Sequence, residues 1–498
     1  MSSNGVEIRE VGTITEVKRG IVKLAGLPSC IMGQLIELGP GAHGFVVGFT
    51  DREVLALTVG RADELAVGQR VNVRQQPLRL QVGPQWLGRV LSPLGTPLDG
   101  EAAPAGEGLQ PMFTEAPGIL ARTPVERQLR TGTKVIDAMV PLGRGQRELI
   151  IGDRMTGKTT LALDAILNQQ GQDVLCIYCS IGQSQHRVQE VAELLRERGA
   201  LSYSAIIAAP ASREASEQFL APFAAAAVGE FFMQQGRDVL VVFDDLSKHA
   251  WAYRQLSLLL ERSPGREAYP GDMFYIHAQL MERAGQLSPE RGGGSMTFLP
   301  MCEAQQGDVT GYITSNLISM TDGQIYLSSE LFYEGVKPAV DLGLSVSRIG
   351  NKVQSHLLRW ASGQLRLELL QYLELLRLTR FASTSNPQVM QRQQQGALLR
   401  RLLSQAAHQP MAIEDQTLLF YAFRTGLARR VSEEGLKVCL AGLSGRMPEF
   451  VGEMLRANEP LSPAAHAKLR AALEDVLGPY LSPEPGATPH AIAEAPAR

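Results

Sequence analysis

The sequence predicts a multidomain protein with a small N-terminal β-barrel, a central α/β domain and a C-terminal α-helical domain. Two observations carry this prediction. The pattern of apolar residues changes twice along the chain. It passes from short apolar alternations between glycines to buried strands that alternate with helical patterns, and then to helical periodicity alone. A phosphate-binding loop, Gly-x-x-x-x-Gly-Lys-Thr, lies in the middle stretch, which makes the central domain a P-loop nucleotide-binding domain.

The first domain, residues 1–74, is predicted from short apolar segments that recur between glycine turns. Their close and even spacing is typical of a small all-β barrel. We expect the strands to contain Val11–Val17, Ile21–Leu24, Gln34–Leu38, Gly44–Phe49, Val54–Val59 and Arg70–Val73.

The second domain, residues 75–353, contains the apolar runs LIIGD, VLCIYCSI, SAIIAA and DVLVVFDD. Continuous apolar runs of this kind predict a parallel sheet that is covered on both faces. Helical patterns follow over residues 354–480 and predict a helical domain. The last residues, 481–498, are rich in Pro and Ala and predict a disordered tail. The apolar positions that first mark the helical domain are Leu357, Leu358, Leu365, Leu369, Leu373 and Leu376.

The phosphate-binding loop lies within LIIGDRMTGKTTLALDAIL, residues 149–167, between an apolar strand and a helical pattern. Glycines let backbone N–H groups turn towards phosphate oxygens, and the helix N-terminus adds partial positive charge. We expect Lys158 to lie over the β- and γ-phosphates and the Thr159 hydroxyl to ligate Mg²⁺. The sequence therefore predicts a nucleoside phosphate as ligand. The residues of this site are Gly152, Asp153, Arg154, Met155, Thr156, Gly157, Lys158 and Thr159.

A second nucleotide-site motif follows the strand Val239–Phe243, which ends in two aspartates. A carboxylate at the C-terminal end of such a strand can hold Mg²⁺ opposite Thr159. The same residues could instead cap a helix, since Asp is a good N-cap. We assign Asp244 to the metal and Asp245 to the cap.

The bulk properties exclude several functional classes. A formal net charge of −3 offers no basic surface for nucleic acid. The start of the chain has no apolar signal core, and no stretch reaches the roughly 20 apolar residues of a membrane span, so we expect a cytosolic protein with no direct membrane insertion. Cys176 and Cys179 lie in one apolar strand pattern, three positions apart, and are interpreted as core thiols on opposite faces.

Three segments strongly resemble alpha subunits of F-type ATP synthases. They are PLGRGQRELIIGDRMTGKTTLALDAILNQ, FDDLSKHAWAYRQLSLLLERSPGREAYPGDMFYIH, and SMTDGQIYL followed by LFYEGVKPAVDLGLSVSRIG. The resemblance runs from about Val11 to about Tyr480, and it implies a RecA-like parallel sheet in the central domain. It also implies ATP or ADP and Mg²⁺ as ligands.

The resemblance further implies a place in a rotary complex. Three such chains would alternate with three beta subunits around a gamma shaft, together with stator subunits of the membrane sector. The complex would sit peripherally at the cytoplasmic face of the bacterial inner membrane. Whether Na⁺ or H⁺ is the coupling ion, and whether the complex mainly makes or hydrolyses ATP, is not encoded in this chain.

Gln183 stands where catalytic relatives carry a glutamate that activates the attacking water. On the sequence alone, an incidental polar residue at a strand end is the preferred interpretation. Within the alpha pattern, an amide can hold a water molecule but cannot accept its proton. The resemblance therefore implies a site that binds Mg-ATP and hydrolyses it very slowly.

Arg348, in the motif SVSRIG, is the second residue for which the resemblance implies a specific role. Taken alone, an arginine after a strand is more often a solvated or ion-paired surface residue. In the alpha family, the arginine of this motif reaches the catalytic site of the neighbouring beta subunit and stabilises charge on the γ-phosphate. Arginine fingers of this kind are worth roughly 10³–10⁵ in rate.

The chain departs from the usual alpha pattern at Met155, near the expected phosphates, and at Lys337 and Ala407, near the expected adenine pocket. Met155 replaces a glutamine, Lys337 replaces an arginine and so lacks its planar fork, and Ala407 replaces a second glutamine. Phe332 and Gln405 remain as candidate ATP-binding residues. We expect weaker or less selective adenine binding as a result.

The N-terminal barrel pattern starts almost at once, without the helical segment that usually docks a delta subunit. On this ground the chain resembles the alternative N-type branch, whose complexes lack delta.

Three other functions would each require different sequence features. A self-sufficient hexameric rotary or export-type ATPase would need a carboxylate at position 183. An RNA translocase of the Rho type would need a basic, aromatic barrel surface, but Phe45 and Phe49 are the barrel's only aromatics. A subunit without nucleotide binding would not need Lys158 and Thr159.

Overall fold

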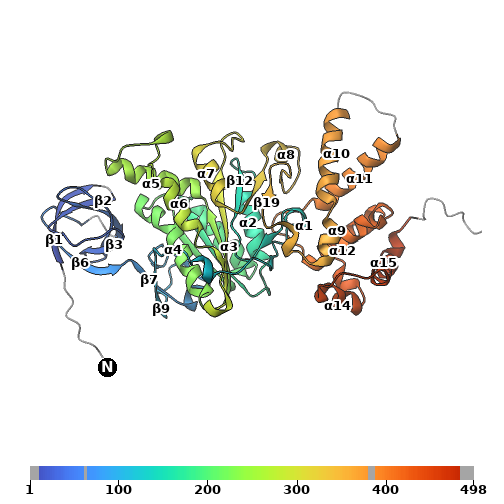
Figure 1. Cartoon of the computed structure of the whole chain (residues 1–498), viewed down its shortest axis with the longest axis horizontal. Coiled ribbons are helices and arrows are strands. Elements are labelled where there is room, and N and C mark those ends of the chain that lie inside the picture. The colour runs from blue at the N-terminus through green and yellow to red at the C-terminus, as the bar shows by residue number, and fades with distance from the viewer. Residues whose placement is uncertain (1–9, 19, 61–63, 380–386, 483–498) are drawn as a thin grey trace, which may run out of the picture. The chain divides into compact units, whose positions relative to one another are not determined.

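The computed structural model describes residues 10–18, 20–60, 64–379 and 387–482 (Figure 1). The predicted tail, residues 481–498, lies outside the described part of the chain except for Leu481 and Ser482.

The chain divides into two compact units. The first joins Met1–Thr131 to Leu142–Val353, and the second joins Gly132–Pro141 to Gln354–Arg498. The segment Gly132–Pro141, which the sequence places in the central domain, thus packs with the helical residues. The domain boundaries drawn from the sequence stay predictions.

The N-terminal strands close into an antiparallel barrel (Figure 1). They are β1 (Glu10–Lys18), β2 (Ile21–Ala25), β3 (Gln34–Gly39), β4 (Ala42–Phe49), β5 (Val54–Gly60) and β6 (Arg70–Pro77). Their order is β1-β2-β5-β4-β3-β6, and because β6 pairs with β1 the sheet has no free edge. Alternate side chains, among them Ile14, Leu24 and Val46, fill the interior. The predicted barrel is confirmed.

The central sheet carries the candidate site. Its strands are β8 (Val90–Leu91), β12 (Glu148–Gly152), β13 (Val174–Ile181), β14 (Ser204–Ala209), β15 (Asp238–Asp244), β16 (Gly285–Gln286), β17 (Ser295–Glu303), β18 (Gly323–Leu327) and β19 (Val346–Ser347). The order is β19-β18-β12-β17-β15-β13-β14-β8, with β16 beside β17. The pairings are parallel apart from those of β16 and β19. The predicted parallel sheet is confirmed.

Helices and two short strand pairs complete the first unit. The helices are α2 (Lys158–Leu167), α3 (Gln185–Glu197), α4 (Ala215–Met233), α5 (Leu246–Leu259), α6 (Met273–Met281), α7 (Tyr312–Met320) and α8 (Ser329–Tyr333). The pairs are β7 (Arg79–Val82) with β9 (Gly108–Pro111) and β10 (Gln128–Leu129) with β11 (Leu142–Gly143). Helix α4 packs against β13 and β15, and α2 packs against β12 and β15.

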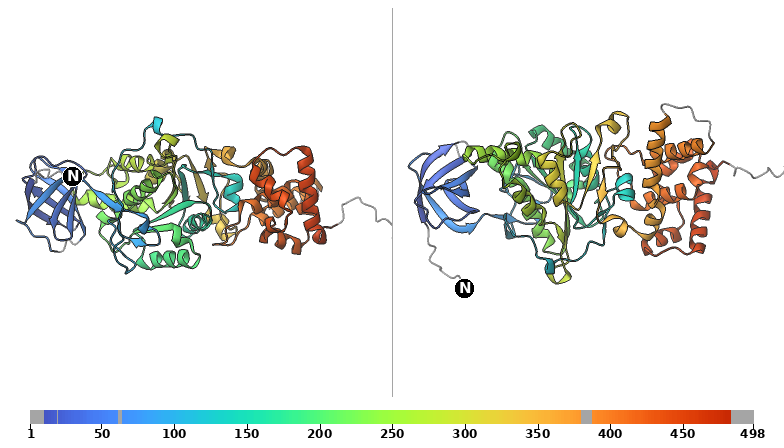
Figure 2. Two further views of the ribbon diagram at one scale, coloured as in Figure 1. Left: turned by 90° about the horizontal axis from the view of Figure 1, so that it is seen from below. Right: turned by 45° about the horizontal axis from the view of Figure 1, so that its top comes forward.

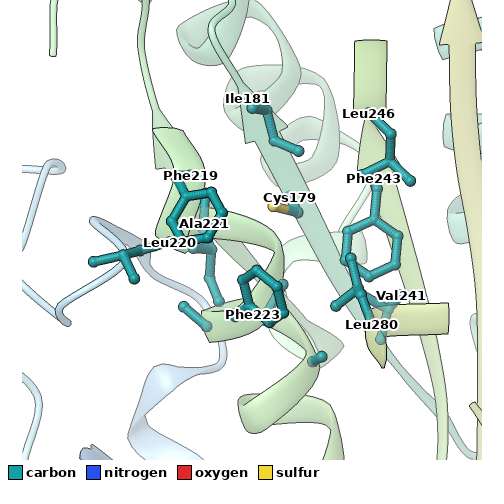
Figure 3. Close-up of a cluster of buried hydrophobic side chains, with 14 of the residues drawn as sticks. Cys179, Ile181, Phe219, Leu220, Ala221, Phe223, Val241, Phe243, Leu246 and Leu280 are labelled. Atoms are coloured by element: carbon teal, nitrogen blue, oxygen red, sulfur yellow. The ribbon is translucent and has the colours of Figure 1, made fainter. Parts of the chain in front are cut away.

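The main apolar core lies between α4 and the sheet. Figure 3 shows Cys179 of β13 and Val241 and Phe243 of β15 near Phe219 and Phe223 of α4. These side chains are buried because the alternate residues of the two strands face the same helix. The continuous apolar runs of the sequence are thereby explained, since the residues between them face the other side of the sheet.

Cys176 and Cys179 illustrate this alternation. Cys179 belongs to the core that faces α4, and Cys176 lies three positions away on the opposite face of β13. Both side chains are fully buried, and burial raises the pKa of each thiol. The prediction that they point to opposite faces is confirmed.

The second unit is helical, as predicted, and Figure 2 shows its helices from two further sides. Ser355, Ser432 and Ser462 cap three of these helices, because each side chain accepts a backbone N–H in the first turn. Within the described residues, no helix of either unit is long and apolar enough to cross a membrane. The helices are α1 (Lys134–Met139), α9 (His356–Ser362), α10 (Leu365–Thr379), α11 (Pro387–Leu403), α12 (Ile413–Arg424), α13 (Glu433–Ala441), α14 (Glu449–Ala457) and α15 (Pro463–Leu477).

Two histidines are buried in the core beside α4. His249 Nε2 lies 3.1 Å from the Phe219 carbonyl oxygen, and His249 Nδ1 lies 3.1 Å from His277 Nε2. A carbonyl can only accept, so His249 Nε2 carries a proton, and a neutral His249 ring accepts from His277 at Nδ1. Burial of both rings favours this neutral form. Burial lowers the pKa of His249 to about 4 and also lowers that of His277.

Acid should destabilise the protein through this pair. An unfolded histidine has a pKa of about 6.5, so the unfolded chain binds more protons than the native chain between about pH 6.5 and pH 4. The stabilising contribution is complete above pH 6.5 and is lost as the pH falls. From pH 7 to pH 5, His249 alone should cost about 2 kcal/mol of unfolding free energy. Urea titrations at both pH values measure this, and His249→Gln should reduce the difference; an unchanged difference would contradict it.

Candidate nucleotide-binding site

The phosphate-binding loop joins β12 to α2 with the geometry that its glycines allow. Gly157 has φ of 99°, which favours glycine, and it precedes the first residue of α2. At Gly152, a Cβ atom would lie only 2.7 Å from both the Leu327 carbonyl oxygen and Thr156 Oγ1. The loop therefore needs glycine at one end for conformation and at the other for space.

Lys158 begins α2 and is buried. Its Nζ donates to the carbonyl oxygens of Gly152 at 2.8 Å and Asp153 at 2.7 Å. An ammonium group has three donors, so one remains for a ligand after these described contacts. Burial lowers the pKa of Lys158, against the influence of nearby carboxylates. The side chain thus lies over the loop, where a phosphate group would bind.

Thr159, in the first turn of α2, and Asp244, the last residue of β15, lie close together, as the sequence predicts for a metal site. Thr159 Oγ1 donates to Asp244 Oδ2 at 2.8 Å, and Tyr178 Oη donates to the same oxygen at 2.6 Å. A hydroxyl and a carboxylate at this distance are hard oxygen ligands of the kind that Mg²⁺ prefers. These residues therefore fit Mg²⁺.

Asp245 has the capping role expected of it. Its carboxylate accepts the backbone N–H of Lys248 at 3.0 Å and so caps α5. Burial, followed by the charge of Asp244, raises the pKa of Asp245 to about 6. The two neighbouring aspartates thus differ in role, one bonded to the loop threonine and the other to a helix end.

Gln183 lies just beyond the end of β13 and contacts the metal-site aspartate. Its Nε2 donates to Asp244 Oδ1 at 2.9 Å, and its Oε1 accepts from Lys248 Nζ at 2.7 Å. The flanking carboxylate and ammonium assign the two ends of the amide. Both ends are bonded, and neither can accept a proton from water. Lys248 would also face any carboxylate placed at this position.

The remaining loop residues divide into inward and outward groups. Asp153 Oδ1 accepts the Gly307 N–H at 2.9 Å, and Thr156 Oγ1 donates to the Asp153 carbonyl at 2.9 Å, so both stabilise the loop. Arg154 Nε lies 3.6 Å from Glu303 Oε1 with its side chain largely exposed. Met155 is 90% exposed at the tip of the loop.

The candidate adenine residues lie in different units. Phe332, in α8, is half-buried, and Lys337 Nζ lies over its ring at 5.5 Å from the centroid. Gln405 belongs to the second unit. Its Oε1 accepts the Lys134 N–H at 2.9 Å, and its Nε2 donates to the Gly132 carbonyl at 2.7 Å. The Gln405 amide thus has a structural role that the sequence did not indicate.

Arg348 lies near the N-terminal ends of β12 and β18, whereas the phosphate-binding loop follows the C-terminal end of β12. Arg348 follows Ser347, which pairs with Gly323, and Gly323 pairs with Glu148 at the start of β12. The loop begins at Gly152, at the other end of that strand, about 13 Å away at about 3.3 Å per residue. The Arg348 side chain is exposed, and within the described residues no hydrogen bond or ion pair reaches its guanidinium.

A pocket of about 780 Å³ surrounds Arg348. Arg122, Arg147 and Lys352 also line it, against two carboxylates, Glu126 and Asp322, of which Asp322 pairs with Arg147 at 2.7 Å. Burial, followed by the charge of Arg147, lowers the pKa of Arg122. A surface with this excess of cations can receive an anionic group from outside the chain.

Sequence reasoning missed Tyr178, which bonds to Asp244, and Lys248, which bonds to Gln183. Tyr178 sits within a continuous apolar strand, where a buried aromatic is the ordinary interpretation. Lys248 lies in the first turn of α5, just after Asp244 and the N-cap Asp245, and this short separation is the signal that could have placed it near the site.

Comparisons with known proteins agree with this geometry. Residues 132–347 match the ATP synthase alpha/beta family, nucleotide-binding domain, and residues 354–476 match the ATP synthase alpha/beta chain, C terminal domain. The ATP synthase subunit alpha of Caldanaerobacter subterraneus subsp. tengcongensis is 44% identical over 471 residues, covering 94% of this chain and 93% of the relative. The chain belongs to the ATP synthase alpha subunit family. The subunit alpha of Desulforudis audaxviator is 43% identical over 474 residues, with the same coverage.

Family membership makes this chain a subunit of ATP synthase, an ATPase complex, with a nucleotide-binding domain for ATP or ADP. The barrel, the parallel sheet and the helical second unit agree with the architecture of ATP synthase alpha subunits.

Proposed function

We propose that this chain is the non-catalytic, regulatory alpha subunit of a rotary F-type ATP synthase. It binds Mg-ATP at its own loop with negligible turnover and donates Arg348 to the catalytic site of a neighbouring beta subunit. The observation that carries the proposal is that Arg348, just after β19, lies level with the start of β12, whereas the loop follows the end of β12. An exposed guanidinium there is remote from the chain's own phosphate site and available to a neighbour.

The contacts of Gln183 support the absence of turnover. A general base must accept the proton of the attacking water. The Gln183 amide cannot do so, and Asp244 Oδ1 and Lys248 Nζ occupy both of its ends. Thr159 and Asp244 would hold Mg²⁺ and position the phosphates without activating a nucleophile.

The proposal includes the partners of such a subunit. Three copies alternate with three beta subunits around a gamma shaft, and stator subunits link them to the membrane sector. The assembly lies at the cytoplasmic face of the bacterial inner membrane. Assignment to the N-type branch without a delta subunit stays a prediction of the sequence.

A self-sufficient hexameric export-type ATPase is the alternative. It would require the chain to turn over ATP by itself, with Arg348 of one copy serving the site of the next. The two functions differ in one measurable property, which is hydrolysis by the chain without a beta subunit.

The test is Mg-ATP binding and phosphate release by the purified chain alone. We expect saturable binding with negligible turnover, and Lys158→Ala should abolish the binding because it removes the buried ammonium over the loop. Lys437→Ala, on an exposed lysine of α13, is the matched control and should bind normally. Turnover in the ordinary enzymatic range, about 1–10³ per second, would favour the alternative.

Base selectivity can be measured in the same experiment. Lys337 presents a point charge to Phe332 where an arginine would offer a planar stacking group. GTP should therefore compete with ATP more effectively at this site than at one with arginine, and Lys337→Arg should restore preference for ATP. Strict rejection of GTP by the unaltered chain would contradict the expectation of a loosened adenine site.

A further inference from the structure

The turn that carries Arg348 is fastened to the interior of the sheet by a buried glutamine. Gln146 is fully buried just before β12. Its Oε1 accepts the Gly143 N–H at 2.8 Å, so its Nε2 must be the donor end of the amide. This nitrogen donates to Glu148 Oε2 at 2.7 Å and to Ser347 Oγ at 3.1 Å. Each polar atom of the Gln146 side chain is thus bonded.

Ser347 links Gln146 to the backbone on both sides of Arg348. Its Oγ accepts from Gln146 and also from the Gly350 N–H at 3.3 Å, so one hydroxyl ties the sheet to the turn that follows the arginine. The Arg348 N–H itself donates to the Asp322 carbonyl at 2.8 Å. The backbone of Arg348 is therefore held, while its exposed side chain has no described partner.

Glu148 completes the buried anchor. Its side chain is fully buried, and a Cβ at Gly323 would lie 2.5 Å from Glu148 Oε2, so the carboxyl group is closely packed. Burial, followed by the charge of Asp322, raises the pKa of Glu148 well above its usual range. The Glu148 carboxyl group accepts from the Gln146 amide at the base of the Arg348 turn.

We propose that Gln146 is a positioning residue for Arg348, which it holds in place through Ser347 with Glu148 as its buried anchor. The inference rests on the proposed role of Arg348 as a donor to the catalytic site of the beta subunit. Displacement of a catalytic group by about 1 Å can cost 10²-fold in rate. Loss of the hydrogen bonds that hold this turn should therefore slow ATP hydrolysis. Gln146 and Ser347 touch no nucleotide in this proposal.

The test is steady-state ATP hydrolysis by the assembled complex with its beta and gamma subunits. Gln146→Met keeps the length of the side chain but removes the amide, and Ser347→Ala removes only the last link. We expect each to lower kcat by roughly 10- to 100-fold. KM for Mg-ATP should not change, because the lost interaction acts in the transition state. Ser347→Thr, which keeps the hydroxyl, should restore turnover.

A double-mutant cycle separates positioning from general damage to the fold. Combined with Arg348→Ala, neither Gln146→Met nor Ser347→Ala should lower turnover further, because there is no arginine left to position. Additive losses would overturn the proposal, as would wild-type turnover in Ser347→Ala. If Gln146→Met does not assemble, Ser347→Ala and its threonine counterpart decide.

The control is Gln169→Met, which removes another buried amide that bonds to the Ala165 and Arg130 carbonyls, far along the chain from Arg348. It should leave turnover unchanged, and a loss equal to that of Gln146→Met would count against a specific effect. Full turnover by Arg348→Ala alone is a separate outcome. It would refute the proposed function itself rather than the bracing of the turn.

Discussion

Replacing Arg348 by alanine should lower ATP hydrolysis by the assembled complex by roughly 10³-fold or more, in the range of other arginine fingers. The guanidinium would stabilise charge on the γ-phosphate in the beta-subunit site, and no described residue pairs with it in the isolated chain. The loss should appear in kcat, because the interaction strengthens in the transition state. Steady-state phosphate release by the reconstituted complex measures it.

Two controls make this result specific to Arg348. Arg348→Ala should leave Mg-ATP binding by the isolated chain unchanged, since Arg348 lies level with the start of β12 and the loop follows the end of that strand. Arg348→Lys keeps the charge but not the planar fork, so it should recover only part of the rate. A variant that hydrolyses ATP normally, or that loses binding at its own loop, would refute a role in trans.

Replacing Arg283 by methionine should reduce the unfolding free energy by about 3–5 kcal/mol. Arg283 and Glu230 are both buried and form two hydrogen bonds, at 2.6 and 2.7 Å. Arg283 also donates to the Met112 carbonyl at 2.9 Å. Methionine would leave the Glu230 carboxylate buried without its cation, which is why the cost far exceeds that of a surface pair. Urea unfolding of the purified chain gives the difference.

The matched control is an exposed ion pair of the same unit. Arg187 and Glu190 lie on one face of α3, 3.0 Å apart, with about half of each side chain exposed. Arg187→Met should cost at most about 0.5 kcal/mol. Adding Glu230→Gln to Arg283→Met should recover part of the stability, because it removes the uncompensated charge. Equal losses at the buried and exposed pairs would contradict the argument.

The candidate metal-site residues could be brought together from the sequence because their signals are local in the chain, and their role towards Mg²⁺ stays a prediction. A strand, a glycine loop and a helix in sequence determine where Lys158 and Thr159 lie. The strand that ends at Asp244 is parallel to the loop strand, and C-terminal ends of parallel strands meet at one edge of a sheet. The structure places Thr159 and Asp244 at 2.8 Å, as two such local patterns imply.

Local sequence patterns do not predict the other contacts of the site. Tyr178 and Lys248 bond to Asp244 and Gln183 from within patterns that otherwise indicate core and helix. Gln405 was expected near the adenine, yet its amide bonds to backbone groups of Gly132 and Lys134, more than 200 positions earlier in the chain. Contacts between distant segments carry no periodic signal, so a single sequence does not reveal them.

The sequence by itself determined the order of barrel, parallel sheet and helices, since hydrophobic periodicity depends only on which face each residue buries. It also determined the phosphate-binding loop. Only the tertiary structure decided that Arg348 lies at the far edge of the sheet, that Gln146 braces its turn, and that Arg283 and Glu230 form a buried pair. The physical reason is that strand order and register bring together groups whose separation along the chain says nothing about their distance in space.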